Sequence, residues 1–187
     1  KVLIDNIAML FDRGKINSAL IVAPKGVYRN WEKQEIPTHM PEHVDYSILV
    51  WNPSSTSFLK EYAKFIKNND NLKIFLINID AFSTSRGTEI AKRFLTATQC
   101  LMAIDESTTI KTPTAKRTKT VCKMRTLAKY RRILTGSPVT KSPLDLYTQC
   151  YFLDPELLGF ASYYTFKNRY AVMISRSVAT HSFKQIV

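Results

Sequence analysis

The sequence lacks several features that mark membrane, secreted and metal-binding proteins. No run approaches about 18 consecutive apolar residues, which excludes an ordinary membrane-spanning helix. There is no signal peptide, and the chain begins with Lys1 instead of Met, so we expect its natural start to lie upstream. The three cysteines are odd in number and widely spaced. They form neither a disulfide framework nor a zinc site, and they suit a reducing compartment such as the cytoplasm.

Internal repeats, low-complexity tracts and Pro/Gly-rich linkers are absent as well. The chain has 187 residues, which is the usual size of one domain, and 45% of them are hydrophobic. That apolar content is enough for a real core and excludes wholesale disorder.

Acidic residues are few, and one long stretch of the sequence has none. The chain carries 27 Lys and Arg against 15 Asp and Glu, a net charge of +12, which indicates an anionic partner: most commonly nucleic acid, less commonly an acidic membrane surface. Between Ser107 and Leu144 there is no acidic residue, whereas ten are basic: Lys111, Lys116, Arg117, Lys119, Lys123, Arg125, Lys129, Arg131, Arg132 and Lys141. A solvated face whose acidic partners lie elsewhere is the alternative. Such a face usually mixes both signs, so we favour an anion-binding surface.

Short, nearly continuous apolar runs predict buried strands. They occupy residues 19–23, 47–50, 74–77, 100–104 and 132–135. Runs of this length are typical of strands that are covered on both faces in a parallel sheet. Between them, residues 3–11, 58–66 and 144–152 have apolar side chains at helical spacing. Alternating strands and helices predict an α/β fold in three layers, with a mostly parallel sheet and helices on both faces.

Ligands of such folds collect at the carboxyl ends of the strands, so we looked there for chemistry. The run at 100–104 is followed by Asp105-Glu106, and the run at 132–135 is followed by Gly136-Ser137-Pro138. An acidic pair at the tip of a buried strand is costly unless a cation or a reaction uses it. An Asp at this place can hold Mg²⁺ beside nucleotide phosphates, and a neighbouring Glu can activate water. Two carboxylates that cap a helix are the alternative.

The order of segments resembles the first RecA-like lobe of Swi/Snf-type superfamily II helicase-like ATPases. Residues 20–36 are similar to the "APxxxxxNW…EI" region of motif Ia, and residues 76–80 to the "INYD/E" segment. Residues 103–111 (AIDESTTIK) resemble motif II, usually "DEAHxIK", and residues 132–138 (RILTGSP) resemble motif III, "RxxLTGTP". The stretch 143–159 resembles the end of the lobe. Each motif is weak by itself, but their common order over about residues 2–171 is specific. The short form is more similar to phage or bacterial members, which implies the cytoplasm of a bacterium or of a phage-infected cell.

The resemblance implies an ATP- and Mg²⁺-dependent motor on double-stranded DNA and assigns roles to individual residues. Asp105 would coordinate Mg²⁺ beside Glu106, and Glu106 would activate the attacking water. Thr135, Gly136, Ser137 and Pro138 would form the loop that couples hydrolysis to movement; the alternative is a plain turn. The departure is Ser107-Thr108, where the family has Ala-His. Thr108 stands where a His usually links the nucleotide site to motif III, which puts the coupling in doubt more than the hydrolysis.

Basic residues near the same strand ends are candidates for contacts with DNA phosphates. They are Lys25, Arg29, Lys111, Lys116 and Arg117. Contacts of this kind carry no sequence information and suit a motor that steps along any DNA. Trp31 could stack on a base, but we favour a role in packing its helix on the sheet.

A P-loop is absent from the sequence. The motif requires Gly-x-x-x-x-Gly-Lys-Ser/Thr, and the only Gly-Lys pair, Gly14-Lys15, is followed by Ile16. The family has a "GxGKT" loop directly before a helix like that at residues 2–11, so we expect the chain to begin just after it. The second RecA-like lobe, a partner in the same protein that usually supplies an arginine finger, is also missing. Residues 1–187 are therefore predicted to be one partial domain that does not hydrolyse ATP alone.

The missing P-loop strand has a consequence for stability. We expect it to lie next to the strands at 100–104 and 132–135, which would otherwise face a gap with unpaired backbone groups. The isolated segment is then predicted to be unstable or to aggregate.

Three functions stay open at this point. The first is an ATP-driven double-stranded DNA translocase of which this is most of the first lobe. The second is a non-catalytic nucleic-acid-binding module derived from such a motor, which the Ser107-Thr108 departure would favour. The third is another P-loop enzyme such as a nucleotide kinase, against which the ordered motifs argue.

Overall fold

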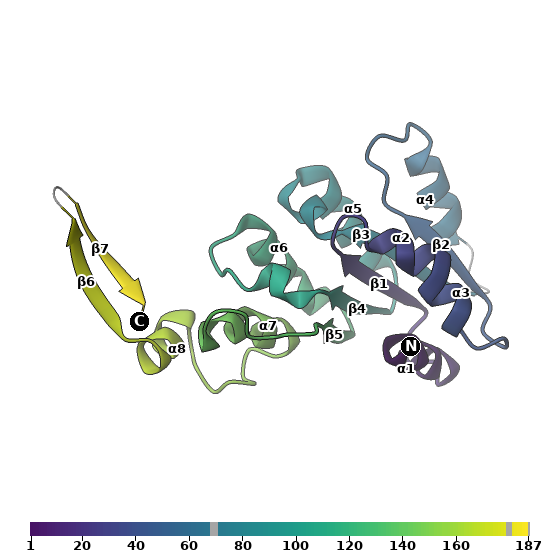
Figure 1. The fold of residues 1–187 in the computed structure, drawn as a ribbon. Coiled ribbons are helices and arrows are strands. Elements are labelled where there is room, and N and C mark those ends of the chain that lie inside the picture. Colours follow the sequence, from purple (N-terminus) through teal and green to yellow (C-terminus); the bar gives the residue numbers. More distant parts are fainter. Residues whose placement is uncertain (68–70, 179–180, 187) are drawn as a thin grey trace.

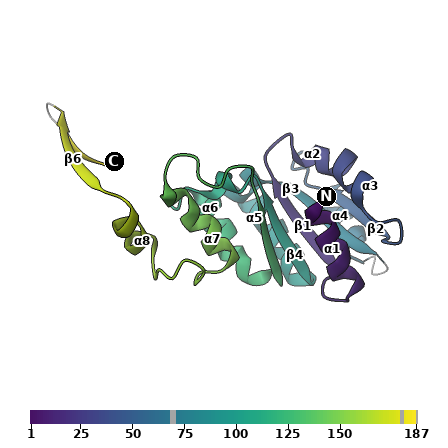
Figure 2. The same cartoon turned by 60° about the horizontal axis from the view of Figure 1, so that its bottom comes forward.

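A computed structural model describes residues 1–67, 71–178 and 181–186. Its centre is a five-stranded, all-parallel sheet in the order β2-β3-β1-β4-β5 (Figures 1 and 2). The strands are β1 (Ser18–Ala23), β2 (Tyr46–Val50), β3 (Leu72–Asn78), β4 (Cys100–Asp105) and β5 (Tyr130–Leu134). All five lie where apolar runs predicted them, and the α/β class with a parallel sheet is confirmed. The last strand begins and ends earlier than the predicted run at 132–135.

Position in the sheet decides how deeply each strand is buried. The three inner strands β1, β3 and β4 are almost completely buried. The two edge strands are only half-buried, since β2 has a single buried residue and β5 has none. The prediction of burial on both faces is therefore wrong for the edge strands, because each has a neighbour on one side only.

One face of the sheet is covered by the N-terminal helices. Helix α1 (Val2–Asp12) lies on this face together with a continuous helical segment, residues 28–39. That segment consists of α2 (Tyr28–Asn30), a π-helical turn at Trp31–Glu35 and α3 (Ile36–His39). Buried side chains of α1, with Trp31 and Ile36, pack on the alternate residues Ala19, Ile21 and Ala23 of β1. The apolar stripe predicted for residues 3–11 is thus a core-facing helix.

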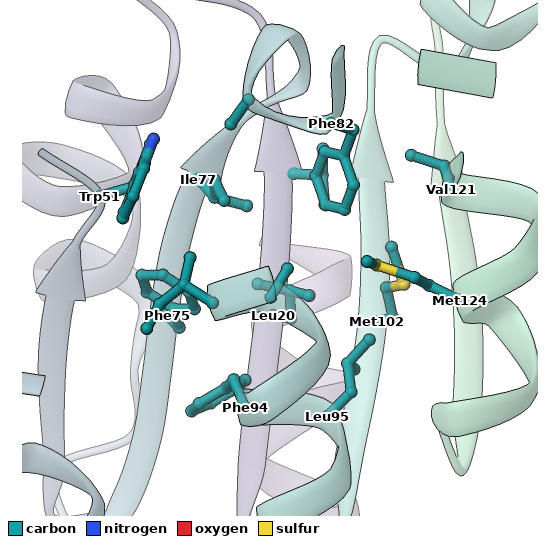
Figure 3. Close-up of a cluster of buried hydrophobic side chains, with 14 of the residues drawn as sticks. Leu20, Trp51, Phe75, Ile77, Phe82, Phe94, Leu95, Met102, Val121 and Met124 are labelled. Atoms are coloured by element: carbon teal, nitrogen blue, oxygen red, sulfur yellow. The ribbon is translucent and has the colours of Figure 1, made fainter. Parts of the chain in front are cut away.

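The opposite face is covered by α4 (Phe58–Lys67), α5 (Ser85–Ala97), α6 (Lys116–Met124) and α7 (Leu146–Leu153). Figure 3 shows this core, where Leu20 and Phe75 of the sheet lie near Phe94 and Leu95 of α5, and Met102 of β4 lies beside Met124 of α6. Helices α4 and α7 confirm the helical spacing at 58–66 and 144–152, whereas α5 was not predicted. Within the described ranges, no helix is long and apolar enough to cross a membrane.

The C-terminal part leaves the α/β layers. Helix α8 (Tyr163–Tyr170) is capped by Ser162, whose hydroxyl accepts a hydrogen bond from the Thr165 backbone amide in a capping box. An antiparallel hairpin, β6 (Met173–Val178) and β7 (His181–Ile186), follows and projects away from the sheet (Figure 1). Phe166 of α8 packs on Tyr147 of α7 in a small separate cluster, which connects α8 to the lobe.

The gap that we expected between the motif II and motif III strands is not there. Strands β4 and β5 are hydrogen-bonded neighbours, with Asp105 opposite Leu134 and Leu101 opposite Tyr130. The expectation was wrong because the missing strand is not needed between them; on this side, only the outer edge of β5 is unpaired. The instability of the isolated chain stays a prediction. The expected cause is now one unpaired strand edge, that of β5, instead of two.

Candidate functional site at the carboxyl edge of the sheet

All five strands of the sheet are parallel, so their carboxyl ends meet at one edge. Lys25 follows β1, Asp80 follows β3, Asp105 ends β4 and Thr135 follows β5. This topology brings the motifs predicted from separate parts of the sequence to the same side of the molecule.

Asp105 is held by a hydrogen bond to each of its carboxylate oxygens. The Trp31 indole Nε1–H donates to Oδ2 at 2.8 Å, and the Glu106 backbone N–H donates to Oδ1 at 3.0 Å. Trp31 is 6% exposed, so its ring packs in the core while its single polar atom reaches the end of β4. The preferred packing role of Trp31 is confirmed. Its contact with Asp105 joins the helical segment 28–39 to the acidic pair and was not predicted.

Replacing Trp31 by Phe tests that contact, because it removes the indole donor and keeps an aromatic ring. We expect the free energy of unfolding to fall by about 1.5–3 kcal/mol more than in Trp51→Phe, the usual contribution of a hydrogen bond to a charged group. Trp51 is a suitable control since it is equally buried and no hydrogen bond from its indole is present in the described part of the chain. Urea unfolding of both variants measures the difference; equal losses would show that only packing matters.

Glu106 differs from Asp105 in its exposure, its hydrogen bonding and its backbone conformation. Its side chain is exposed and has no hydrogen-bond or ion-pair partner among the described residues. Its backbone is left-handed, with φ of 50°, and it is the only non-glycine residue with positive φ in the described ranges. Such a conformation costs about 1–3 kcal/mol and is enriched at active sites and ligand-binding sites. The second carboxylate of the pair is thus free to contact a solvent molecule, while the first is fixed.

The residues at the end of β4 suit a magnesium ion only in part. Two hydrogen bonds leave further lone pairs on the Asp105 carboxylate, a hard oxygen ligand of the kind that Mg²⁺ prefers. No cluster of three or more His, Cys, Asp or Glu side chains that could hold a metal occurs in the described part of the chain. A site with one carboxylate is typical of Mg²⁺ that is shared with substrate phosphates. The groups present therefore fit Mg²⁺ bound together with a nucleotide, and the loop that would hold those phosphates is not in this sequence.

The turn after β4 is connected to the loop after β5 by hydrogen bonds of the buried Gln149 side chain. Ser107 Oγ donates to Gln149 Oε1 of α7 at 2.6 Å, and Gln149 Nε2 donates to the Pro138 carbonyl at 2.8 Å. Thr108, which the resemblance singled out for coupling, has no side-chain hydrogen bond within the described residues. Its coupling role stays a prediction, and so does that of residues 135–138. Gln149 was missed, although a Gln among the apolar residues of that helix was a signal.

A second cluster holds the same loop from its exposed side. Asp145 Oδ2 accepts from the Thr140 hydroxyl at 2.7 Å, from the Thr140 and Lys141 amides at 3.0 Å each, and lies 3.5 Å from Lys111 Nζ. Burial raises the pKa of the Asp145 carboxyl, but these hydrogen bonds and the Lys111 charge outweigh it and lower the pKa to about 2. Asp145 therefore stabilises the loop at neutral pH, and this contribution is lost only as the pH falls towards that value. Lys111, predicted to bind phosphate, already has this internal partner.

Two of the predicted DNA-binding residues line one large hollow. It has a volume of about 1010 Å³ and lies at the carboxyl ends of β1, β2 and β3. Lys25 and Arg29 are exposed in it, and the cations of Lys33 and Arg86 line it too. Glu32, Glu61 and Asp80 line the hollow as well, so its four cations and three carboxylates leave a net charge of only +1. The exposed Lys25 and Arg29 are the groups in it that suit an anionic polymer. Lys33 and Arg86 were not predicted, because they belong to no motif.

The basic stretch 107–144 divides into two groups. Six of its cations have partners within the fold, but only Lys111 and Arg117 contact acidic residues, Arg117 through Asp80 at 3.1 Å. Others serve the fold: Arg131, for example, donates to the carbonyls of Leu153, Arg125 and Ala128. The remaining four are exposed and have no partner in the described ranges: Lys116, Lys119, Lys123 and Lys141. Acidic partners elsewhere in the fold thus explain only two of the ten charges, and the first three free ones lie on α6.

Comparison with known proteins agrees with this geometry. A sequence model of the SNF2-related domain matches residues 3–185. The chain belongs to this family. Two solved structures from Sulfolobus solfataricus are similar to it: the SWI2/SNF2 ATPase core in complex with double-stranded DNA, 26% identical with a TM-score of 0.61, and the same ATPase core domain, 27% identical with a TM-score of 0.60. Among curated proteins, no sequence matches the chain.

The chain matches only part of each of these two structures. Each match covers 89% of this chain, but only 31% and 30% of the two archaeal chains. The family and the RecA-like α/β lobe predicted from the ordered motifs are confirmed. This SNF2-related domain therefore corresponds to less than a third of the ATPase cores that it resembles.

Proposed function

We propose that this SNF2-related domain is the first lobe of an ATP-dependent double-stranded DNA translocase. The observation that supports it most is the end of β4, where a fixed Asp105 and a free Glu106 lie at the edge of the sheet that also carries the hollow with Lys25 and Arg29. A nucleotide site and a DNA site on one edge of a rigid sheet are what a motor needs in order to couple them. The archaeal relative that was solved with double-stranded DNA supports the choice of partner.

In this proposal, Asp105 holds Mg²⁺, and Glu106 orients and deprotonates the attacking water. The bound Mg²⁺ would neutralise charge on the nucleotide phosphates. Trp31 keeps the Asp105 carboxylate in place through its indole N–H, so the ligand does not have to be ordered at the moment of binding. Glu106, with no internal partner among the described residues, keeps its carboxylate available to accept a proton.

The phosphate-binding loop and the second lobe would be supplied by the rest of the protein. Helix α1 leads through a short turn into β1, so it runs opposite to the strand, and its amino end lies at the carboxyl edge of the sheet. Arg132 Nε donates to Asn6 Oδ1 at 2.9 Å, which places α1 close to β5. A P-loop that precedes Lys1 would then enter beside Asp105, and its strand could pair with the open edge of β5. The second RecA-like lobe would close on the same edge and add an arginine finger.

The first experiment is ATP hydrolysis by the full-length protein with and without double-stranded DNA. Translocases of this kind hydrolyse ATP faster on duplex DNA, so stimulation supports the proposal. Absence of hydrolysis combined with salt-sensitive DNA binding would identify the domain as a non-catalytic binding module derived from a motor. A rate of ATP hydrolysis or phosphoryl transfer that does not change when DNA is added would favour a different P-loop enzyme.

The salt dependence of DNA binding tests the predicted phosphate contacts. If Lys25 and Arg29 each contact a phosphate, replacing both by Ala should reduce the slope of log K against log salt by ~1.8, since each neutralised phosphate contributes ~0.9. The matched control is Arg13→Ala with Lys15→Ala, two exposed cations in the turn at the opposite edge of the sheet. Equal slopes for the two double variants would show that the hollow does not bind the DNA backbone. The measurement is fluorescence anisotropy of a labelled duplex at several salt concentrations.

A further inference from the structure

Gln149 occupies an unusual position for a long polar side chain. It lies in the middle of α7 and is completely buried, and so is its partner Ser107. Burial of an amide and a hydroxyl without hydrogen bonds would cost several kcal/mol, roughly 2–7 by transfer measurements. The structure avoids this cost, because every one of these polar groups has a partner.

The orientation of the Gln149 amide follows from those partners. Its Nε2 donates both hydrogens, one to the Pro138 carbonyl at 2.8 Å and one to the Asp145 carbonyl at 2.7 Å. Carbonyl oxygens only accept, so the nitrogen has to face them and Oε1 has to face Ser107. Ser107 Oγ accordingly donates to Oε1 at 2.6 Å. A fully satisfied network of this kind specifies a single arrangement of the segments that it joins.

The segments joined by Gln149 are the two whose relative position matters for the proposed function. Ser107 directly follows Glu106 on the turn after β4, and Pro138 lies in the loop after β5. The side chain therefore connects the candidate catalytic turn to the loop that the motif order assigns to coupling. Asp145, whose carbonyl is the third partner, also binds Thr140 and Lys141 through its carboxylate. The segment 138–141 is consequently held to α7 by Gln149 and to the residue before α7 by Asp145.

We propose that Gln149 is a positioning residue that couples the two ends of the proposed motor site. Through Ser107 and Pro138, a change in the position of Glu106 would move the loop after β5, and a movement of that loop would shift Glu106. Gln149 would thus connect the turn after β4 to the loop after β5. Thr108 does not make this connection, because its half-buried side chain has no hydrogen bond in the described part of the chain. This inference rests on the proposed function and adds to it the residue that links nucleotide and DNA.

The test is a mutant cycle in the full-length protein. Ser107→Ala and Gln149→Leu each leave a buried polar group unpaired, so both should lower the unfolding midpoint. The double variant removes both members of the Ser107–Gln149 pair, which is often close to neutral for stability, and leaves only the Pro138 and Asp145 carbonyls without their Nε2 donor. Its unfolding midpoint should therefore lie no lower than that of Gln149→Leu alone, while stimulation of ATP hydrolysis by duplex DNA should stay lost, by about five-fold or more.

A second readout does not depend on turnover. A non-hydrolysable ATP analogue with Mg²⁺ should change the affinity of the wild-type protein for duplex DNA, because coupling between two binding sites is reciprocal. The double variant should bind the analogue and the DNA separately, but the effect of one on the other should be at least five-fold smaller. A residue that only stabilises the fold would not alter this coupling at a temperature where the double variant is fully folded.

Thr148→Val is the matched control. Thr148 is the neighbouring buried residue of α7, and its hydroxyl donates to the Ile110 carbonyl at 2.6 Å, at the far end of the same turn. It does not reach the loop after β5, so its loss should lower stability and leave DNA stimulation unchanged. Wild-type coupling in the double variant, or an equal loss in Thr148→Val, would overturn the role of Gln149. A wild-type protein that does not hydrolyse ATP would instead overturn the proposed function itself.

Discussion

The Glu106→Gln variant of the full-length protein should hydrolyse ATP on duplex DNA ~10²-fold or more slowly than the wild type, within the usual effect of removing a positioned acid–base group. The neutral amide can still form a hydrogen bond with water, but it cannot accept the proton. Asp105 keeps both of its hydrogen bonds in this variant, because one comes from Trp31 and the other from the backbone amide of residue 106. Nucleotide binding should therefore be retained, and only the hydrolysis step should slow.

Two measurements make this prediction specific. Binding of a fluorescent ATP analogue separates loss of affinity from loss of rate. The control is Glu42→Gln, which makes the same change at an exposed glutamate with no partner in the described part of the chain. A Glu106→Gln protein that hydrolyses ATP at the wild-type rate would show that another group activates the water, and the role assigned to the end of β4 would have to be abandoned.

The isolated chain of 187 residues should show no steady ATP hydrolysis, with or without DNA. It contains no P-loop, so no backbone amides and no lysine are arranged to hold the phosphates beside Asp105. It also lacks a second lobe, and the arginine finger that such a lobe supplies is worth about 10³–10⁵ in rate. Removing either group would lower turnover far below that of the complete protein.

Steady phosphate release by the purified chain measures this directly. The Glu106→Gln form of the same chain is the control for contaminating ATPases, since it should differ only in the candidate catalytic group. Turnover that disappears in the Glu106→Gln form would contradict the prediction and would mean that residues 1–187 hold the nucleotide by a surface other than a P-loop. Residual turnover that is equal in both forms would come from a contaminant and would agree with it.

Most of the strands and helices of the lobe could be predicted from the sequence, because buried positions are occupied by apolar residues. The inner strands β1, β3 and β4 are apolar at nearly every position, since helices cover both of their faces. Helices α1 and α4 show the spacing of a single buried stripe. Helix α5 also carries its buried residues at helical spacing, at Gly87, Ile90, Ala91, Phe94 and Leu95, so the pattern was present in the sequence and was missed.

The acidic pair and the motifs after β1, β4 and β5 could also be found from the sequence, because each is a short run of neighbouring residues. Their common edge follows from the parallel sheet. The sequence alone was not sufficient to place the missing strand correctly: the pairing of β4 with β5 is a property of the sheet, and the residues of both strands are compatible with either arrangement.

The tertiary structure decided the contacts between residues that are distant in the chain. Trp31 meets Asp105 across 74 positions, and Ser107 meets Gln149 across 42, so no local pattern shows that the pairs touch. It also decided which cations are free, since Lys111 and Arg117 are bound to Asp145 and Asp80, whereas Lys116 is not bound in the described residues. Strand and helix identity depend on neighbours within one element and can be predicted from the sequence. Hydrogen bonds between elements depend on how those elements pack, and only the folded chain determines them.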